Sequence, residues 1–351
     1  MITKIVTIDT KNFNDNELEE AAMILRNDGL VAFPTETVYG LGANGLNPLA
    51  AKKIYAAKGR PSDNPLIIHI ADMKALEELT TGVSEIGMKL ANAFWPGPLT
   101  LICNKSDKVP YGTTGGLETV AIRMPSHPIA YELIKKSKVY VAAPSANVSG
   151  RPSPTKAEHV IEDLSGIVDM IIDGDKVSIG LESTIVDVTG EIPTILRPGY
   201  ITLDMLKEVV GEVVYDPAVL KTTAMENVVA KAPGMKYKHY APKGELTIFE
   251  GEDDKVLEAI NKNVAKKIEE GYVVGVIGTD ETIDKYPLGI VKTIGTRKDE
   301  ETIARGLFEI LRDFDKDEVQ FIYSESFRSS RLGQAIMNRL LKAAGYHIEM
   351  V

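Results

Sequence analysis

Two stretches of the chain repeat one pattern, a short apolar strand that runs into a polar loop rich in glycine and proline. In the first, residues 30–33 lead into residues 34–40, and a helix then delivers Lys58 and Arg60. In the second, residues 139–143 lead into a loop that begins at Pro144. Buried strands that end in loops of Ser, Thr, Asn and Arg are where α/β proteins place their ligands. The pattern therefore predicts an α/β fold with a nucleotide site in this half of the chain.

Apolar strands alternate with amphipathic helices up to about residue 215, although the alternation is not strict. Asn47 and Pro48 supply an N-cap and a proline at the first helical position of one such helix. Strands are predicted near residues 4–8, 30–33, 66–70, 99–103, 119–124, 139–143, 170–172, 183–188 and 194–197. The irregular alternation predicts a twisted mixed sheet rather than a purely parallel one.

The last part of the chain is more regular. From Glu245 onward, strands near residues 246–249, 272–278, 291–294, 319–323 and 346–350 alternate with helices near residues 254–270, 298–314 and 331–344. This order predicts a small Rossmann-like α/β domain with a parallel sheet. A chain of 351 residues is too long for one typical domain, so two domains are expected.

The stretch between these domains is basic and carries aromatic side chains. Residues 231–243 hold four lysines and no acid, with Tyr237, His239 and Tyr240 among them. Prolines and a glycine punctuate the stretch, which predicts a linker. Aromatic and cationic side chains together suggest a segment that lies on something anionic, and a plain solvated linker remains the alternative.

The composition limits the classes of function. A net charge of −10 gives no global attraction for nucleic acid, so any phosphate-binding region must be local. Cys103 is the single cysteine, which excludes an internal disulfide and a cysteine-based zinc site and fits a reducing compartment. The sequence shows no signal peptide and no apolar run of membrane-spanning length. We therefore expect a cytoplasmic protein with no role at a membrane.

Gly40, Gly42 and Gly45 form a weak match to a dinucleotide-binding fingerprint. That fingerprint needs its first glycine at the end of a strand and a helix that starts at the third. Here six residues separate the strand at 30–33 from Gly40, and the helix begins only at Pro48. We therefore expect these glycines to permit a tight turn with positive φ instead. The chain also lacks the P-loop pattern.

Lys58 and Arg60 lie where a helix gives way to Gly59 and Pro61. In a loop both cations can converge on a phosphate chain, although two solvated surface cations would look the same. Further along, His69 alternates with apolar neighbours, so its side chain points to the face opposite theirs. Alternatively, His69 is a buried histidine whose hydrogen bonds are all made within the protein, with no role in ligand binding.

Other polar residues recur at predicted strand ends. Ser145 and Asn147 can form an anion- or sugar-binding nest, and Ser153 precedes a helix whose N-terminus would attract phosphate. Arg123 sits in an apolar strand and needs a partner, for which a substrate carboxylate is one candidate. Arg197 ends another strand. These residues form a charge-stabilising set without a nucleophile, which favours nucleotidyl transfer by positioning and electrostatics.

Lys58-x-Arg60 with Ser145-x-Asn147 resembles the K-x-R…S-x-N signature of the YrdC-like threonylcarbamoyl-AMP synthases. The surrounding segments agree, namely PTETVYGLG (34–42), KGRPSDNPL (58–66), PSANVSGRPSPT (144–155), ESTIVD (182–187) and LRPG (196–199). The linker PGMKYKHYAP (233–242) resembles that of the longer two-domain form of the family. The resemblance covers essentially the whole chain. It implies a YrdC-like catalytic domain over 1–215, a lid over 216–243 and a Rossmann-like domain over 244–351.

The resemblance also implies a reaction, in which L-threonine, bicarbonate and ATP give L-threonylcarbamoyl-adenylate and pyrophosphate. A partner transferase complex then moves the threonylcarbamoyl group to a tRNA adenosine. The residues that would hold threonine are Thr37, His69, Arg123, Ala143 and Ser183. Those that would hold ATP are Arg60, Asn64, Thr119, Ser145, Ser153, Arg197 and His239, with Lys58 and Asn147 completing the catalytic signature. Mg²⁺ is implied as the cofactor, held mainly through the ATP phosphates rather than by a protein-built cage.

Two rival functions remain open from the sequence. A carbamoyl-adenylate former of the hydrogenase-maturation type shares the core fold, but one cysteine and 351 residues leave no room for its extra zinc-finger modules. An RNA-binding module without catalysis would show a basic face and a steep salt dependence of its affinity. The net charge counts against that module and leaves at most weak RNA binding.

Overall fold

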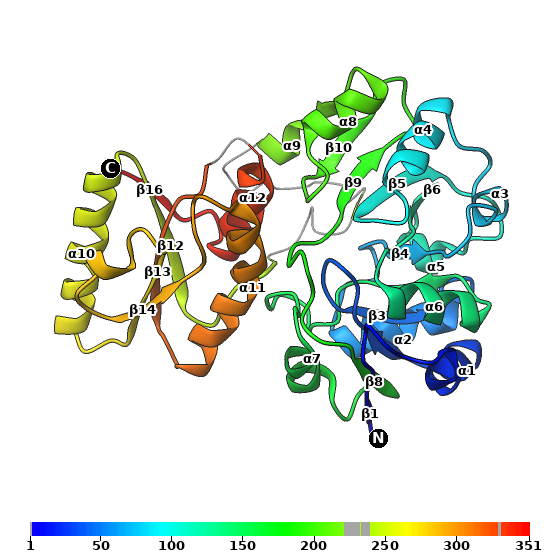
Figure 1. Ribbon diagram of the computed structural model, residues 1–351, viewed down its shortest axis with the longest axis horizontal. Coiled ribbons are helices and arrows are strands. Elements are labelled where there is room, and N and C mark those ends of the chain that lie inside the picture. Colours follow the sequence, from blue (N-terminus) through cyan, green and yellow to red (C-terminus); the bar gives the residue numbers. More distant parts are fainter. Residues whose placement is uncertain (1, 221–231, 233–238, 329–330) are drawn as a thin grey trace. The chain divides into compact units, whose positions relative to one another are not determined.

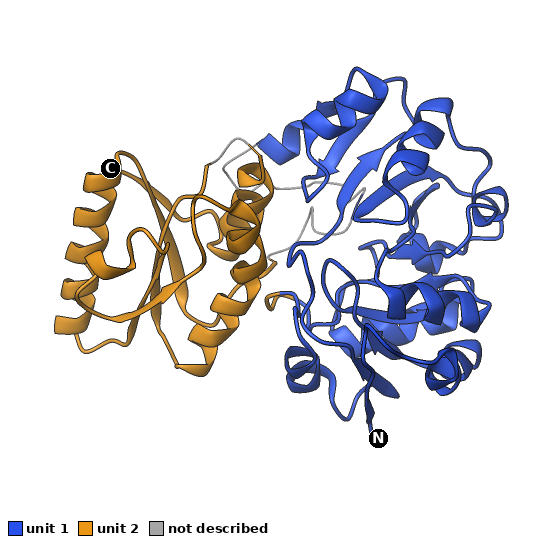
Figure 2. Cartoon of the chain, viewed as in Figure 1, with its two compact units in different colours: residues 1–149, 153–220, 225–236 blue, residues 150–152, 221–224, 237–351 orange. Residues whose placement is uncertain are grey.

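The structure is a computed structural model that describes residues 2–220, 232, 239–328 and 331–351. Its described residues fall into two compact units, which Figure 2 colours separately. The first unit holds 2–149, 153–220 and Ala232, and the second holds 150–152 together with the described residues from 239 onward. Most of the expected lid lies outside the described residues, so the lid stays a prediction. In the described part of the chain, no helix is long and apolar enough to cross a membrane.

The first unit is built on a twisted mixed sheet of 11 described strands, which confirms the expected fold class. The strand order is β1-β8-β2-β3-β7-β4-β6-β5-β9-β10-β11, with parallel and antiparallel pairs interleaved. The strands are β1 (Lys4–Thr7), β2 (Val31–Phe33), β3 (Gly40–Asn44), β4 (Ile67–His69), β5 (Leu99–Asn104), β6 (Thr119–Arg123), β7 (Val141–Ala142), β8 (Met170–Asp173), β9 (Thr184–Asp187), β10 (Thr194–Arg197) and β11 (Val214–Tyr215).

Helices of the first unit begin and end where local signals place them. In α2 (Pro48–Lys58), the Asn47 side chain caps the first turn, and Gly59 ends the helix in the left-handed conformation with φ 59°. The others are η1 (Asp15–Leu18), α1 (Glu19–Arg26), α3 (Ala75–Leu79), α4 (Glu85–Phe94), α5 (Tyr111–Thr114), α6 (Pro128–Ser137), α7 (Ala157–Leu164), α8 (Leu203–Val210) and α9 (Pro217–Leu220).

The two faces of the sheet differ around β4, β5, β6 and β9. On one face, Ile68, Leu101 and Ile122 form a large apolar core with side chains of α3, α4 and α8. The opposite face carries a small cluster in which Ile67, Ile102, Ala121, Ile185 and Leu196 from five strands surround Ala232. Among the described residues, that cluster receives no helical side chain. Around these four strands the second face is therefore open, whereas α1 and α6 cover it over β2 and β7. The polar residues considered below lie beside the small cluster on this open part.

The second unit is a five-stranded sheet in which every described pair is parallel, as the sequence predicted. Its strand order is β14-β13-β15-β12-β16, with α10 on one face and α11 and α12 on the other (Figure 1). The elements are β12 (Glu245–Glu250), α10 (Asp253–Glu269), β13 (Val274–Gly278), η2 (Ile283–Lys285), β14 (Ile290–Thr293), α11 (Glu300–Lys316), β15 (Phe321–Glu325), α12 (Gly333–Ala343) and β16 (Ile348–Met350).

Residues 150–152 join the second unit because α11 holds their backbone. The buried Arg312 donates hydrogen bonds from Nε and Nη2 to the Pro152 carbonyl, at 3.1 and 2.7 Å. Asp315 accepts from the Lys243 backbone N–H at 2.6 Å, and the Gly150 carbonyl accepts from the Ala241 N–H at 2.8 Å. The loop that follows β7 is thus anchored partly by residues far along the chain.

The prediction of a tight turn with positive φ is wrong for Gly40 and Gly42, and Gly45 lies in a turn but without positive φ. Gly40 and Gly42 lie in β3, which pairs with β2 and β7, and none of the three has positive φ. A Cβ added to Gly42 would lie 2.7 Å from Phe33 Cε1 and 2.8 Å from Val141 Cγ1. The glycine is needed there because neighbouring side chains fill the space that a methyl group would occupy.

Candidate active site

Three polar side chains form a row across adjacent strands on the open face of the sheet. His69 of β4 lies opposite Arg123 of β6, and Arg123 lies opposite Thr100 of β5. Residues paired in register point to the same face, so all three side chains lie beside the small apolar cluster. This orientation confirms that His69 faces away from Ile68, which belongs to the opposite core.

Arg123 is buried and held on several sides. Its Nη2 makes an ion pair with Glu36 Oε1 at 2.8 Å, and its Nη1 donates to Thr37 Oγ1 at 2.9 Å. Burial alone would raise the pKa of Glu36, but Arg123 and backbone N–H groups together hold that pKa below its ordinary value. Glu36 is therefore a carboxylate at neutral pH. The partner that the sequence required for Arg123 is present within the chain.

His69 is a neutral histidine in this environment. Its Nδ1 lies 3.2 Å from the Ile67 carbonyl, and the residue is 3% exposed. Burial, reinforced by the Arg123 guanidinium, lowers the pKa of His69 to about 3. A neutral imidazole offers one donor and one acceptor, so His69 can hydrogen-bond a ligand without adding charge.

Lys58 joins the end of α2 to the loop after β7. Its buried ammonium donates to the Ser145 carbonyl at 2.5 Å, to the Asn147 carbonyl and to Asn147 Oδ1 at 3.5 Å. Ser145 Oγ in turn donates to Asn147 Oδ1 at 2.6 Å. The structure therefore brings Lys58, Ser145 and Asn147 together, and the lysine fixes the shape of the loop.

Arg60 and Asn64 lie in the loop between α2 and β4. The Arg60 guanidinium donates to the carbonyls of Asn64 and Pro65, at 3.3 and 3.1 Å from Nη2. Asn64 is buried, and its Oδ1 has no hydrogen-bond partner among the described residues. Extended by two residues, the β4–β6 register puts Thr119 alongside Pro65. By the same reasoning, the antiparallel β4–β7 register puts Ser145 there too.

These registers separate two groups of residues along the same strands. Ser145 and Thr119 lie at the amino end of β4, whereas Arg123 and His69 lie at its carboxyl end. Four residues of strand span roughly 13 Å, which is the length of a nucleotide rather than of an amino acid. The face can therefore accept an extended ligand with chemically different ends.

Ser183 and Arg197 form a third contact group beside Thr100. Thr100 Oγ1 and Ser183 Oγ are 2.7 Å apart, and Arg197 donates to the Ser183 carbonyl and hydroxyl at 3.0 and 3.1 Å. Ser153, which is buried, donates to Glu182 Oε1 at 2.6 Å. Ser183 is thus hydrogen-bonded to Thr100, which lies in the same row as Arg123.

Two predicted residues contribute differently. Ala143 follows β7, and its backbone N–H donates to the Ile67 carbonyl at 2.9 Å, so only its small side chain and its carbonyl remain for a ligand. His239 belongs to the second unit, where its ring lies 5.5 Å from that of Tyr240. Its relation to the open face of the first unit stays a prediction.

Sequence reasoning missed Glu36, Thr100 and Glu182 as site residues. Glu36 and Glu182 are acids beside predicted buried strands, a signal that each has a cationic or hydroxyl partner. Thr100 carries no such signal, because a threonine in a strand is common. Its place next to Arg123 follows only from the pairing of β5 with β6.

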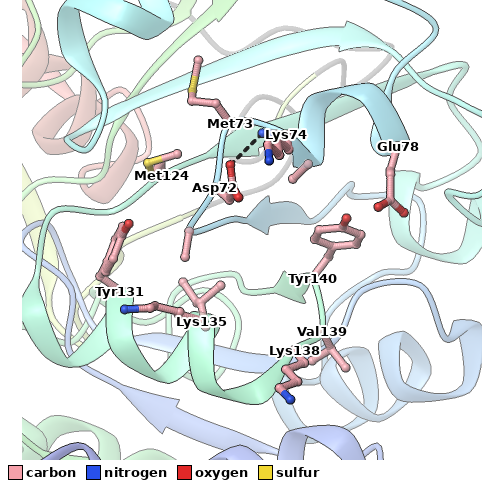
Figure 3. A pocket seen from close by; sticks show the side chains of 13 residues that line it. Asp72, Met73, Lys74, Glu78, Met124, Tyr131, Lys135, Lys138, Val139 and Tyr140 are labelled. Atoms are coloured by element: carbon pink, nitrogen blue, oxygen red, sulfur yellow. Dashed lines mark hydrogen bonds between the residues drawn. The ribbon is translucent and has the colours of Figure 1, made fainter.

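A separate cavity of about 790 Å³ lies beyond the carboxyl ends of β4 and β6 (Figure 3). Asp72, Met124, Tyr131 and Tyr140 are among its lining residues, and none of the residues predicted from the motifs lines it. In the part of the chain that the structure describes, no group of three or more His, Cys, Asp or Glu side chains is placed to hold a metal ion.

Comparison with protein families agrees with this architecture. A family model described as "Telomere recombination", whose name joins Sua5, YciO and YrdC, matches residues 23–199. A second model, described as "Threonylcarbamoyl-AMP synthase, C-terminal domain", matches residues 201–345. The fold and the polar row on its open face therefore define a two-domain protein of the Sua5 and YrdC class.

Individual relatives narrow this class. The threonylcarbamoyl-AMP synthase of Bacillus subtilis (strain 168) is 49% identical over 96% of this chain and 95% of its own length. The synthase of Pyrococcus abyssi is 51% identical over 93% of this chain and 94% of its own length. A crystal structure of P. abyssi Sua5 complexed with L-threonine matches with a TM-score of 0.92 and 47% identity, covering 100% of both chains. The chain belongs to the threonylcarbamoyl-AMP synthase family.

Proposed function

We propose that this enzyme converts L-threonine, bicarbonate and ATP into L-threonylcarbamoyl-adenylate and pyrophosphate. The observation that carries the proposal is the open sheet face. There a row of Arg123, His69 and Thr100 and a second polar group that includes Arg60 and Ser145 lie at opposite ends of the same strands. Membership of a family of synthases that form an AMP-linked product supports this reaction. The match to a solved structure that holds L-threonine supports the choice of amino acid.

Threonine would occupy the carboxyl end of β4 and β6. Arg123 donates a hydrogen bond from Nη1 to Thr37, whereas its Nη2 makes an ion pair with Glu36 and has no hydrogen-bond partner among the described residues. N–H groups of both nitrogens therefore remain for the threonine carboxylate. His69 and Ser183 offer hydrogen bonds for the ammonium or the hydroxyl, and Ala143 is small enough to leave room for the methyl group. Glu36 keeps the pocket close to electrically neutral until the carboxylate arrives.

ATP would occupy the amino end of the same strands. Arg60 lies there with the buried amide of Asn64, and Thr119 and Ser145 supply hydroxyl groups. Ser153 and Arg197 would extend this group toward the phosphates, and Lys58 and Asn147 would hold the loop in shape. The set is rich in cations and hydroxyls, as recognition of an anionic nucleotide requires.

In the proposed reaction, the threonine amine captures CO₂, formed from bicarbonate, to give a carbamate. A carbamate oxygen attacks the α-phosphorus of ATP, the bond to the β-phosphate oxygen breaks, and pyrophosphate leaves with the bonding electrons. Because a carbamate is labile in water, a closed and dry site protects it. Arg60 and Arg197 would stabilise the negative charge that develops on the phosphates.

The basic linker would close the site during turnover. Ala232, the one described residue between 221 and 238, is buried against the open face among Ile67, Ile102 and Ala121. The burial of Ala232 on this face is the observation that supports a linker close to the site. In the proposal, His239 and Tyr240 complete the cover over the nucleotide.

Mg²⁺ is the proposed cofactor; it would be held with the bound ATP and would offset the negative charge of the phosphates. The donor set fits this role, since Ser145, Ser153 and Thr119 offer hydroxyls while the cations Arg60 and Arg197 would share the phosphate charge. The product is an activated carbamate, so a tRNA-modifying transferase complex is the proposed partner downstream. We place the reaction in the cytoplasm, with any RNA binding by this chain weak.

The test measures pyrophosphate release from ATP and bicarbonate, with and without L-threonine, and identifies the product by mass spectrometry. We expect threonine-dependent release and the mass of threonylcarbamoyl-adenylate. Arg123→Gln should reduce kcat/KM for threonine about tenfold to a hundredfold, the range for a lost hydrogen bond to a charged group. Lys89→Gln, which alters an exposed ion pair on α4, is the matched control. Absence of threonine-dependent release, together with tight RNA binding, would favour the RNA-binding module instead.

A further inference from the structure

The second unit has the topology at which parallel sheets bind ligands. The connection from β12 through α10 leads to β13 on one side, and the connection from β15 through α12 leads to β16 on the other. Because both crossovers are right-handed, their helices cover opposite faces, as Figure 1 shows. The neighbouring strands β12 and β15 therefore flank a switch point, and ligands of open α/β sheets bind outside the carboxyl ends of such strands.

A cavity of about 370 Å³ lies at this switch point. Glu250 ends β12, Glu325 ends β15, and both line the cavity together with Thr282, Arg297 and Arg328. The volume is at the small end of the range for ligand pockets. The cavity is therefore large enough for a small metabolite and too small for an extended dinucleotide.

One wall of the cavity is held rigidly by Glu325. This buried carboxylate accepts hydrogen bonds from Thr282 Oγ1 and from Tyr286 Oη at 2.7 Å, and it pairs with Arg297 at 2.5 Å. Burial, followed by the Glu325 charge, raises the pKa of Tyr286, so Tyr286 remains a donor. The Arg297 guanidinium is thereby fixed in place, while its side chain is still 40% exposed. A preorganised cation with free N–H groups suits an anionic group of a ligand.

The opposite wall has an unsatisfied acceptor. Arg328 Nε binds Glu250 Oε1 at 2.6 Å, but Glu250 Oε2 is buried and has no hydrogen-bond partner among the described residues. A buried carboxylate oxygen without a donor is costly, and its presence calls for an explanation such as a ligand. The missing partner must be a hydrogen-bond donor, and an ammonium group satisfies a carboxylate best.

The charges of the lining select between ligand classes. Four carboxylates (Glu250, Asp253, Glu281 and Glu325) face three cations (Lys285, Arg297 and Arg328) in one small cavity. A polyphosphate would be repelled by this excess of carboxylates, and a simple amine would leave the guanidinium groups without a new partner. A zwitterion satisfies both walls at once.

We propose that this cavity binds a free α-amino acid. The carboxylate of the amino acid binds the open N–H groups of Arg297 and Arg328, and its ammonium group pairs with the Glu250 carboxylate. The side chain then points into the remaining volume between β12 and β15. The site lies wholly within the second unit, so it does not depend on the reaction proposed for the first unit.

Equilibrium dialysis of the full-length protein tests the proposal. The labelled probes are glycine, L-serine, L-aspartate and L-lysine, with L-threonine measured in an Arg123→Gln background that weakens the first unit's own site. We expect saturable binding of one equivalent for at least one probe. Glu250→Gln and Arg328→Gln should each weaken that binding about tenfold or more, since each loses a charge-assisted hydrogen bond.

Glu252→Gln is the matched control, because it makes the same change two residues away, outside the cavity lining, on a side chain that pairs with Lys255. Glu252→Gln should bind the probe with the affinity of the unchanged protein, and thermal melts check that each variant folds. Arg328→Gln keeps the test valid if Glu250→Gln unfolds. No saturable binding of any probe at millimolar concentration would overturn the proposal. The proposal would also be overturned if both cavity variants bound the probe with the affinity of the unchanged protein. Displacement of the bound probe by inorganic phosphate alone would overturn it too.

Discussion

At the residue scale, the site depends on buried charges that the chain itself neutralises. A buried guanidinium without a partner would cost several kcal/mol, which is why the sequence required a partner for Arg123. The sequence suggested a substrate carboxylate, and the structure provides Glu36 at 2.8 Å. The threonine role of Arg123 stays a proposal, with Glu36 as the group that keeps Arg123 in place between turnovers.

The histidine beside this pair makes stability depend on pH. The folded-state pKa of His69 is about 3, below its ordinary value of 6.5, so the unfolded chain binds an extra proton between these values. The contribution of neutral His69 to the free energy of unfolding is therefore complete above about pH 6.5, and it is lost as the pH falls toward 3. Its slope reaches about 1.4 kcal/mol per pH unit.

We expect His69→Gln to remove part of this dependence. Urea unfolding of the two proteins across this pH window measures the difference, and the curves should converge at the acidic end. Burial also lowers the pKa of His127, to about 4. His127 therefore makes stability depend on pH in both proteins over a narrower pH range, and it serves as an internal reference. Parallel curves for the two proteins would show that His69 titrates normally.

At the element scale, β3 shows how packing decides the role of a glycine. Local sequence suggested a turn, but β3 lies between β2 and β7, and Phe33 and Val141 occupy the space beside Gly42. Such a position cannot be identified from glycine spacing, because the crowding residues come from two other strands. The same strand supports the loop of Ser145 through an isolated bridge at Gly40.

Gly42→Ala should therefore destabilise the first unit. The added methyl group would overlap Phe33 and Val141, and overpacking of this kind costs about 1–3 kcal/mol. Gly190→Ala is the control, because Gly190 is exposed, lacks positive φ and has no atom within 4 Å of an added Cβ. Chemical denaturation should show a lower midpoint only for Gly42→Ala. An unchanged midpoint would mean that the two side chains move aside at little cost.

At the scale of the whole molecule, we expect the first unit alone to be inactive. A fragment of residues 1–215 lacks the linker, and it also lacks Arg312, whose hydrogen bonds hold the Pro152 carbonyl next to Ser153. Threonine-dependent pyrophosphate release should fall below detection in the fragment.

Two measurements separate this explanation from simple unfolding. Circular dichroism checks the fold of the fragment, and Arg312→Met in the full chain tests the loop anchor directly, with an expected rise in KM for ATP of about tenfold. Lys316→Met, at the exposed end of α11, is the control. Wild-type turnover by the fragment would show that the linker and the second unit are dispensable.

The sequence by itself determined the fold class, the parallel C-terminal sheet and the family, because apolar periodicity and contiguous motifs are local properties of the chain. It also identified most of the polar residues that the structure brings together, since Arg123 and Ser145 stand out at strand ends and Lys58 at the end of a helix. Only the tertiary structure decided that Glu36 pairs with Arg123, that Thr100 joins the row and that Gly42 is enclosed by side chains. These features depend on which strands lie side by side and in which register, and pairing between distant segments leaves no local trace in the sequence.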